Sequence, residues 1–195
     1  MTDNKTYKIL LIGNASVGKT SLINCYNGQK FDNNFISTLG VESIKKKITI
    51  KNKELTLNIM DASGQERFIP LLKNYYRSAD GVIFVFDLTN EKSFEDIDRW
   101  LKDVQNHNDY CTKLLIGNKA DLENIREVNV EKAQMFAINN EMEYFETSAK
   151  DNKNINEIFT IMAKRLIYNK NNNRINSFSI SNKSFNRNNN KKNCC

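Results

Sequence analysis

The chain has 195 residues and a formal net charge of +6, and this length suits one ordinary domain with some residues to spare. All 23 acidic residues lie at or before Glu157, whereas eight of the 29 basic residues come later, so the body is nearly neutral and the end is basic. This division argues against a nucleic-acid-binding core, and four cysteines without a C-x-x-C pair argue against structural zinc.

The first predicted element is a buried strand at Tyr7–Ile12, where apolar residues run together before a glycine. It leads into GNASVGKT at Gly13–Thr20, which matches the phosphate-loop pattern G-x-x-x-x-G-K-[ST], and Ser21–Tyr26 can continue as helix. The glycines let the loop amides turn inward as an anion nest, and the helix N-terminus adds partial positive charge. We therefore expect this loop to bind a nucleotide phosphate chain, with Lys19 on the outer phosphates and the Thr20 hydroxyl on Mg²⁺.

The following stretch combines a loop with a hairpin. Gly28–Gly40 is polar and weakly periodic, which indicates a loop. Ile44–Ile50 and Leu55–Met60 partly alternate between apolar and polar residues, and Lys51–Glu54 between them is a plausible turn. This pattern predicts a half-exposed antiparallel pair.

The middle of the chain alternates between strand and helix patterns. Gly81–Phe86 and Lys113–Gly117 are continuous apolar runs that suit strands covered on both faces, and Met142–Phe145 is a possible sixth strand. Helical spacing is found between them and again late in the chain, at Phe94, Ile97, Leu101 and Val104, and at Ile155, Ile158, Phe159, Met162 and Leu166. The alternation predicts a mostly parallel sheet covered on both sides, with ligands at the carboxyl ends of its strands.

The end of the chain, Asn169–Cys195, has a different composition. Eleven of its 27 residues are Asn, none is acidic, and its apolar residues are isolated. Too little apolar surface is available to offset the entropy of ordering, so we expect a flexible tether here and a folded domain over residues 1–168. No signal peptide and no membrane-spanning run are visible, which favours a reducing, cytosolic compartment.

A polar group at Asp61–Glu66 directly follows a predicted strand. A carboxylate at this position can hold Mg²⁺ through water, and Gly64 lets the backbone approach a terminal phosphate. The Gln65 carboxamide can orient a water in line with that phosphate. In the preceding polar loop, the Thr38 hydroxyl can complete the Mg²⁺ shell when a terminal phosphate is present, and Phe31 can cover the edge of the base.

A second polar group, Asn118–Asp121, ends the predicted strand at Lys113–Gly117. The two oxygens of Asp121 match the N1–H and 2-amino group of guanine, whereas adenine lacks both donors and leaves the carboxylate without partners. The stem of Lys119 can lie over the base, and the backbone amides of Glu146–Lys150 can meet the carbonyl group at position 6.

Together these motifs resemble a Ras-superfamily small GTPase, most closely the Rab family, over about residues 6–168. GNASVGKT, FISTLGVE, DASGQERF, YYRSAD, NKAD and ETSAK occur in the order that the family shows. The resemblance implies an α/β phosphate-loop NTPase with a six-stranded, mostly parallel sheet, one antiparallel edge strand and about five helices. It also implies a switch that cycles between GTP and GDP, with switch loops at Phe31–Glu42 and Ala62–Ser78.

The resemblance carries over residue by residue to a set of site positions. Gln65 is expected to be catalytic, and Thr20, Thr38 and, through water, Asp61 are expected to hold Mg²⁺. The nucleotide-binding residues are expected to be Gly13, Asn14, Ala15, Ser16, Val17, Gly18, Lys19, Thr20, Ser21, Phe31, Thr38, Asp61, Gly64, Asn118, Lys119, Asp121, Ser148, Ala149 and Lys150.

The last two residues, Cys194 and Cys195, resemble the double-cysteine geranylgeranylation signal of Rabs. Two lipid chains, or one with basic residues, make membrane attachment stable. The resemblance implies an exchange factor, a GTPase-activating protein, effectors, prenylation machinery and a lipid-extracting chaperone as partners. We expect a monomer on the cytoplasmic face of an intracellular membrane that cycles with the cytosol.

Ser43 and Met60 depart from the Rab pattern, which usually carries Phe and Trp in a surface triad, so the sequence identifies neither effector nor organelle. Two other functions are compatible with a phosphate loop. Gln65 argues against a signalling module with negligible hydrolysis, and Asp121 argues against an ATP-using phosphate-loop kinase. Trp100, at helical spacing, is interpreted as a packing residue.

Overall fold

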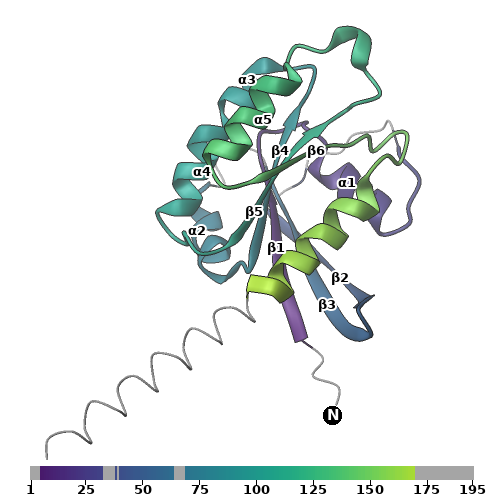
Figure 1. The fold of residues 1–195 in the computed structure, drawn as a ribbon, viewed down its shortest axis with the longest axis vertical. Helices are drawn as coiled ribbons and strands as arrows, with labels where there is room; N and C mark the ends of the chain where they lie inside the picture. The colour runs from purple at the N-terminus through teal and green to yellow at the C-terminus, as the bar shows by residue number, and fades with distance from the viewer. Residues whose placement is uncertain (1–4, 33–37, 39, 64–68, 170–195) are drawn as a thin grey trace, which may run out of the picture.

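The computed structural model describes residues 5–32, 38, 40–63 and 69–169. Within them lies a six-stranded sheet with the order β2-β3-β1-β4-β5-β6 (Figure 1). The strands are β1 (Lys5–Ile12), β2 (Val41–Ile50), β3 (Lys53–Ala62), β4 (Gly81–Asp87), β5 (Thr112–Asn118) and β6 (Glu143–Glu146). All neighbouring pairs are parallel except β2 with β3. This confirms a mostly parallel sheet with one antiparallel edge strand.

The antiparallel pair forms at the predicted place, but its turn is shorter than expected. Ile50 pairs with Lys53, so only Lys51 and Asn52 lie between the strands. Both have positive φ, 48° and 61°. Positive φ at both central residues is typical of a type I′ turn, whose backbone twist matches the right-handed twist of the strands.

Five helical units cover the described part of the sheet. They are α1 (Lys19–Tyr26), α2 (Ile69–Ser78), the nearly continuous pair α3 (Glu91–Glu95) and α4 (Ile97–Gln105), α5 (Val130–Asn139) and a last helix over residues 155–169. The helical spacing predicted from Phe94 to Val104 is confirmed, with a break at Asp96 alone. The Asn90 side chain accepts a hydrogen bond from the Ser93 amide and caps α3 at its N-terminus.

The helices divide between the two faces of the sheet (Figure 1). Apolar side chains of α1 and the last helix form one core cluster with β1, β3 and β5, and those of α2 to α5 form the other. Every residue of β4 is buried, as expected for a central strand with helices on both sides. Among the described helices, none combines the length and the apolar character needed to cross a membrane.

Candidate nucleotide-binding site

The phosphate loop begins at the carboxyl end of β1 and is held tightly against its neighbours. Gly13 has φ 144°, and a Cβ atom there would lie 2.0 Å from the carbonyl oxygen of Val85 in β4. Gly18 has φ 97°, and a Cβ atom there would lie 2.2 Å from Nδ2 of Asn118. Both glycines are therefore required by backbone conformation and by close packing.

Lys19 is buried inside the curve of this loop. Its Nζ donates to the carbonyl oxygens of Gly13, at 2.9 Å, and Asn14, at 2.7 Å. Desolvation lowers the pKa of Lys19 to about 8, although the negative charge of Asp61 opposes that shift. A phosphate group beside this ammonium would stabilise its charged form, so the loop presents a cation that favours an anionic ligand.

Three oxygen-bearing side chains meet beside the start of α1. Thr20 Oγ1 lies 2.5 Å from Asp61 Oδ2, to which it donates, and 2.8 Å from Thr38 Oγ1. Thr38 Oγ1 also lies 3.3 Å from the same Asp61 oxygen. Burial raises the pKa of Asp61, against the hydrogen bond from Thr20 and the charge of Lys19. The structure thus brings together the three residues expected to hold Mg²⁺.

The second oxygen of Asp61 supports an Mg²⁺ site at this place. Asp61 Oδ1 is buried and has no hydrogen-bond partner within the described residues. A buried polar atom without a partner is costly, and hydroxyl and carboxylate oxygens are the ligands that Mg²⁺ prefers. The residues therefore fit an ion held by two hydroxyl groups and a water-bridged carboxylate.

Asn118 joins the phosphate loop to the loops expected to bind the base. Its Nδ2 donates to the carbonyl oxygen of Val17, at 2.9 Å, and its Oδ1 accepts from Thr147 Oγ1, at 3.1 Å. Asn118 is buried at the end of β5. One side chain therefore ties together three loops that are far apart in the sequence.

Residues that follow Asn118 and Thr147 in the chain shape the side of the site that is expected to bind the base. Ser148 Oγ donates to Asp121 Oδ1 at 2.7 Å and accepts from the Asp151 amide at 3.0 Å, which fixes the carboxylate. Lys119 has φ 69° and forms a 2.6 Å ion pair with Asp87 at the end of β4. This ion pair holds the Lys119 side chain along the pocket wall.

These loops line one pocket of about 390 Å³, within the range of small-molecule sites. The sequence did not predict Asp32 and Leu122 as lining residues, although each directly follows a predicted one. The lining residues are Ser16, Gly18, Ser21, Phe31, Asp32, Asn118, Lys119, Asp121, Leu122, Ala149 and Lys150. The phosphate loop and the base-binding loops therefore face the same space.

Some of the predicted site residues do not line this pocket. Gly64, Gln65, Cys194 and Cys195 lie outside the described residues. Ala15 is described and exposed at the tip of the phosphate loop.

One contact of the phosphate loop was not anticipated. Asn14 Oδ1 accepts from the indole Nε1 of Trp100, at 2.9 Å, and Asn14 Nδ2 donates to Asp96 Oδ2, at 2.8 Å. Trp100 is buried in α4 as predicted, so its packing role is confirmed, but it also anchors the loop. No sequence signal distinguishes this tryptophan from the rest of the apolar stripe.

The expectation that position 60 belongs to an exposed triad is wrong. Ser43 and Met60 pair across β2 and β3, but Ser43 is exposed whereas Met60 is 4% exposed and packs in the core cluster with α2. Tyr75 of α2, which occupies the third position of that triad, is half-buried beside the same cluster. The methionine thus serves packing on the sheet face that α2 covers.

Comparison with known proteins agrees with this geometry. The model of the Ras family matches residues 8–168. Ras-related protein Rab-13 of Bos taurus is 41% identical over 162 residues, which cover 83% of this chain and 80% of that protein. Ras-related protein Rab-10 of Diplobatis ommata is 40% identical (83% and 81% covered), and Ras-related protein Rab-8B of Homo sapiens is 38% identical (83% and 78% covered).

Proposed function

We propose how this chain works from the premise that it belongs to the Ras family and, within it, to the Rab small GTPases of vesicle trafficking. It binds GTP and GDP and hydrolyses GTP. The observation that carries our residue assignments is the single pocket shared by the phosphate loop and the base-binding loops. The proposal concerns which side chain performs each step.

The phosphate chain of GTP lies in the loop Gly13–Thr20, with Ser21 at the start of the helix behind it. The backbone amides and the helix N-terminus attract the phosphate oxygens, and Lys19 contacts the outer phosphates. The contacts of Lys19 with the Gly13 and Asn14 carbonyls support this role, because they hold the ammonium within the loop.

The guanine base lies between Phe31 and the stem of Lys119. Asp121 accepts from the N1–H and the 2-amino group, and the hydrogen bond from Ser148 keeps the carboxylate oriented for this pairing. The backbone amide of Ala149 or Lys150 donates to the carbonyl at position 6. This pairing selects GTP over ATP because adenine lacks both donors.

Thr20, Thr38 and, through a water molecule, Asp61 would hold Mg²⁺. When bound, the ion would supply positive charge that offsets the negative charge of the phosphates. Thr38 and the Gly64 amide sense the terminal phosphate, so its loss releases both switch loops. Exchange factor, activating protein and effectors bind through Phe31–Glu42 and Ala62–Ser78.

Gln65 orients the water that attacks the terminal phosphorus, and the bond to the bridging oxygen of GDP breaks. The sequence offers no obvious arginine to stabilise the transition state, so turnover by the chain alone is slow. An activating protein that supplies one accelerates the reaction by roughly 10³–10⁵-fold.

A single-turnover phosphate-release assay tests the role of Gln65. We expect Gln65→Leu to bind GTP as tightly as the wild type and to release phosphate at least about tenfold more slowly, because leucine cannot orient water. Equal rates would remove Gln65 from catalysis and favour a signalling module that relies on exchange alone.

Competition between nucleotides tests the base assignment. Unlabelled GTP should displace a fluorescent GDP analogue at concentrations at least about 10³-fold lower than ATP, because ATP leaves Asp121 without partners. Equal displacement by ATP would contradict the guanine pocket and favour the kinase interpretation.

Cys194 and Cys195 accept geranylgeranyl groups from prenylation machinery, and a lipid-extracting chaperone returns the monomer from the cytoplasmic membrane face to the cytosol. The basic residues that precede them add electrostatic attraction to an anionic membrane surface.

Deletion of both cysteines should leave nucleotide binding intact and move the protein to the soluble fraction. Unchanged membrane association after deletion would contradict the lipid assignment.

A further inference from the structure

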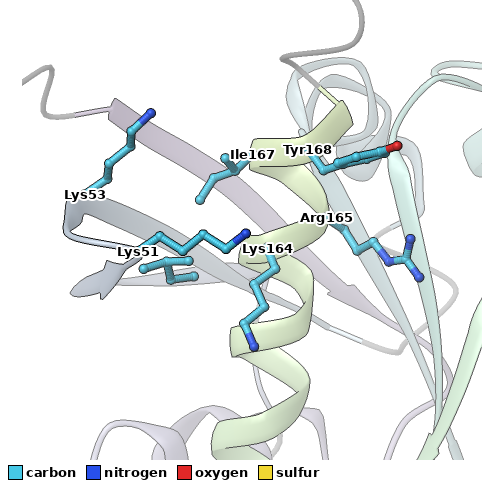
Figure 2. A pocket seen from close by; sticks show the side chains of 7 residues that line it. Lys51, Lys53, Lys164, Arg165, Ile167 and Tyr168 are labelled. Carbon is cyan, nitrogen blue, oxygen red and sulfur yellow. The ribbon is translucent and has the colours of Figure 1, made fainter.

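A second pocket lies between the β2–β3 hairpin and the last helix. Its volume is about 390 Å³. Figure 2 shows Lys51 extending from the hairpin turn toward the helix, near Lys164. The lining residues are Ile50, Lys51, Lys53, Lys164, Arg165, Ile167 and Tyr168. We name this set the hairpin–helix pocket.

The hairpin–helix pocket is at the opposite end of the sheet from the nucleotide site. β3 begins at Lys53, beside the pocket, and ends at Ala62, next to the Asp61 carboxylate. Tyr168 lies near the end of the last helix, whose described residues end at 169. A ligand here does not compete with the nucleotide.

The pocket carries an excess of positive charge. Arg165 is paired with Glu143 at 2.5 Å, and the nearby Glu54 is paired with Lys47 at 3.3 Å. Lys51, Lys53 and Lys164 form no ion pair with any acidic side chain of the described residues. Three lysines without an acidic partner among the described residues line this pocket, and their summed positive charge favours an anionic ligand.

The pocket also offers apolar contact. Ile50 is buried and Ile167 is half-buried beneath the opening, whereas Tyr168 is 61% exposed at its rim. Tyrosine combines an apolar ring with a polar tip, which suits the boundary between water and lipid. A ligand that fits both features has a negative head and an apolar portion.

The segment after residue 169 is a poor occupant for this pocket. Residues 170–195 carry six basic side chains and no acidic one, so they share the charge of the pocket and are repelled by it. The same composition adds to the attraction that an anionic surface exerts on this end of the molecule.

We propose that the hairpin–helix pocket binds the headgroup of an anionic membrane phospholipid. The lysines contact its phosphate and carboxylate oxygens, and Ile167 and Tyr168 contact its apolar portion. The bound lipid directs this end of the domain toward the membrane and leaves the nucleotide site and switch loops facing the cytosol. The contact depends on the folded domain and does not require modification of the cysteines.

Vesicle sedimentation of the unmodified full-length chain tests the proposal. Lys51→Gln/Lys164→Gln should bind vesicles of phosphatidylcholine with 30% phosphatidylserine roughly 25-fold more weakly than the wild type, because each lysine near such a surface contributes about fivefold in affinity. The control Lys102→Gln/Lys132→Gln removes the same charge from exposed positions of α4 and α5, which cover the other face of the sheet. It should stay within about twofold of the wild type, because distant charges are screened. Equal losses in both pairs, or equal binding to pure phosphatidylcholine, would overturn the proposal.

A local reporter gives a second measurement. Tyr168→Trp places an indole at the rim, whereas the native Trp100 is 1% exposed and serves as an internal reference. Brominated phosphatidylserine in the vesicles should quench the added indole at least about twofold more than Trp100 in the wild type. Absence of this extra quenching in vesicle-bound protein would overturn the proposal.

The rate of GTP hydrolysis by each double variant, measured without vesicles, separates this proposal from the proposed function. We expect both double variants to hydrolyse GTP at the wild-type rate, since none of the four substituted lysines lines the nucleotide pocket. A loss of vesicle binding at unchanged hydrolysis would support the lipid contact. A wild-type chain without GTPase activity would contradict the proposed function and leave the vesicle result standing.

Discussion

At the scale of single residues, the phosphate loop depends on backbone positions that only glycine tolerates. Gly13 has a positive φ, and a Cβ atom there would overlap the Val85 carbonyl oxygen, whereas Gly28, after α1, has φ 91° but open space where a Cβ atom would lie. The two glycines therefore separate the cost of backbone conformation from the cost of steric overlap.

We predict that Gly13→Ala lowers the free energy of unfolding by more than about 3 kcal/mol, because strain and overlap with a buried carbonyl add together. Gly28→Ala should cost about 1–2 kcal/mol, the price of a left-handed backbone alone. Urea denaturation of the two variants checks the difference. Similar losses would show that overlap with Val85 does not matter.

At the scale of elements, α4 and the phosphate loop are coupled through polar contacts of Asn14 with Trp100 and with Asp96 at the start of the helix. The indole of Trp100 donates to Asn14, whose backbone carbonyl in turn accepts from Lys19. A helix on one face of the sheet therefore positions a cation on the phosphate-binding edge.

We predict that Trp100→Phe destabilises the fold by about 1–3 kcal/mol and speeds GDP release, because Asn14 Oδ1 loses its donor. Stopped-flow release of a fluorescent GDP analogue and urea denaturation measure both effects. In an Asn14→Ala background the same substitution should have a smaller effect on release. Additive effects would mean that Trp100 acts through packing alone.

Helices differ in how clearly the sequence predicts them. The last helix and α4 bury large side chains at regular spacing, and both were predicted. α5 buries only Ala133 and Ala137, with Asn129 capping its N-terminus, so its apolar stripe is too weak to recognise. Tertiary packing against the sheet stabilises it.

At the scale of the whole molecule, a half-buried ion pair links Glu146, at the end of β6, to the loop after β5. Arg126 donates two hydrogen bonds to Glu146, at 2.9 and 2.8 Å, and Tyr144 donates a third, at 2.7 Å. Burial by itself would raise the pKa of Glu146, but these hydrogen bonds and the charge of Arg126 outweigh it, so the pKa lies below its ordinary value.

This pKa makes stability depend on pH in the acid range. Because the folded value is depressed, the contribution of Glu146 is full above the ordinary glutamate pKa of about 4.3 and is lost as the pH falls through the lower folded value. We predict that Glu146→Gln is less stable than the wild type at pH 7 and that the gap narrows below about pH 4. Urea denaturation between pH 3 and 7 checks this, and a constant gap would contradict it.

The proposed lipid contact and the nucleotide site also belong to this scale, because they occupy opposite ends of one sheet. In parallel strands the carboxyl ends collect the loops that bind the nucleotide, and the amino ends lie beside the end of the last helix. The topology therefore separates the nucleotide site from the hairpin–helix pocket that we propose to face the membrane.

The sequence alone determined the features that depend on local spacing. The phosphate-loop motif, the buried central strands and the antiparallel hairpin could all be predicted, because each is encoded in neighbouring residues with a distinct period or motif. Their order along the chain was enough for the family resemblance and the fold class.

Only the tertiary structure decided which distant residues meet. It joined the phosphate loop to Thr147 through Asn118, anchored Asn14 on Trp100, buried Met60, and set Lys51 beside Lys164 around a basic pocket. The physical reason is that such contacts depend on strand order and on the face to which each side chain points. Those are set by the packing of the whole core, which no short stretch of sequence encodes.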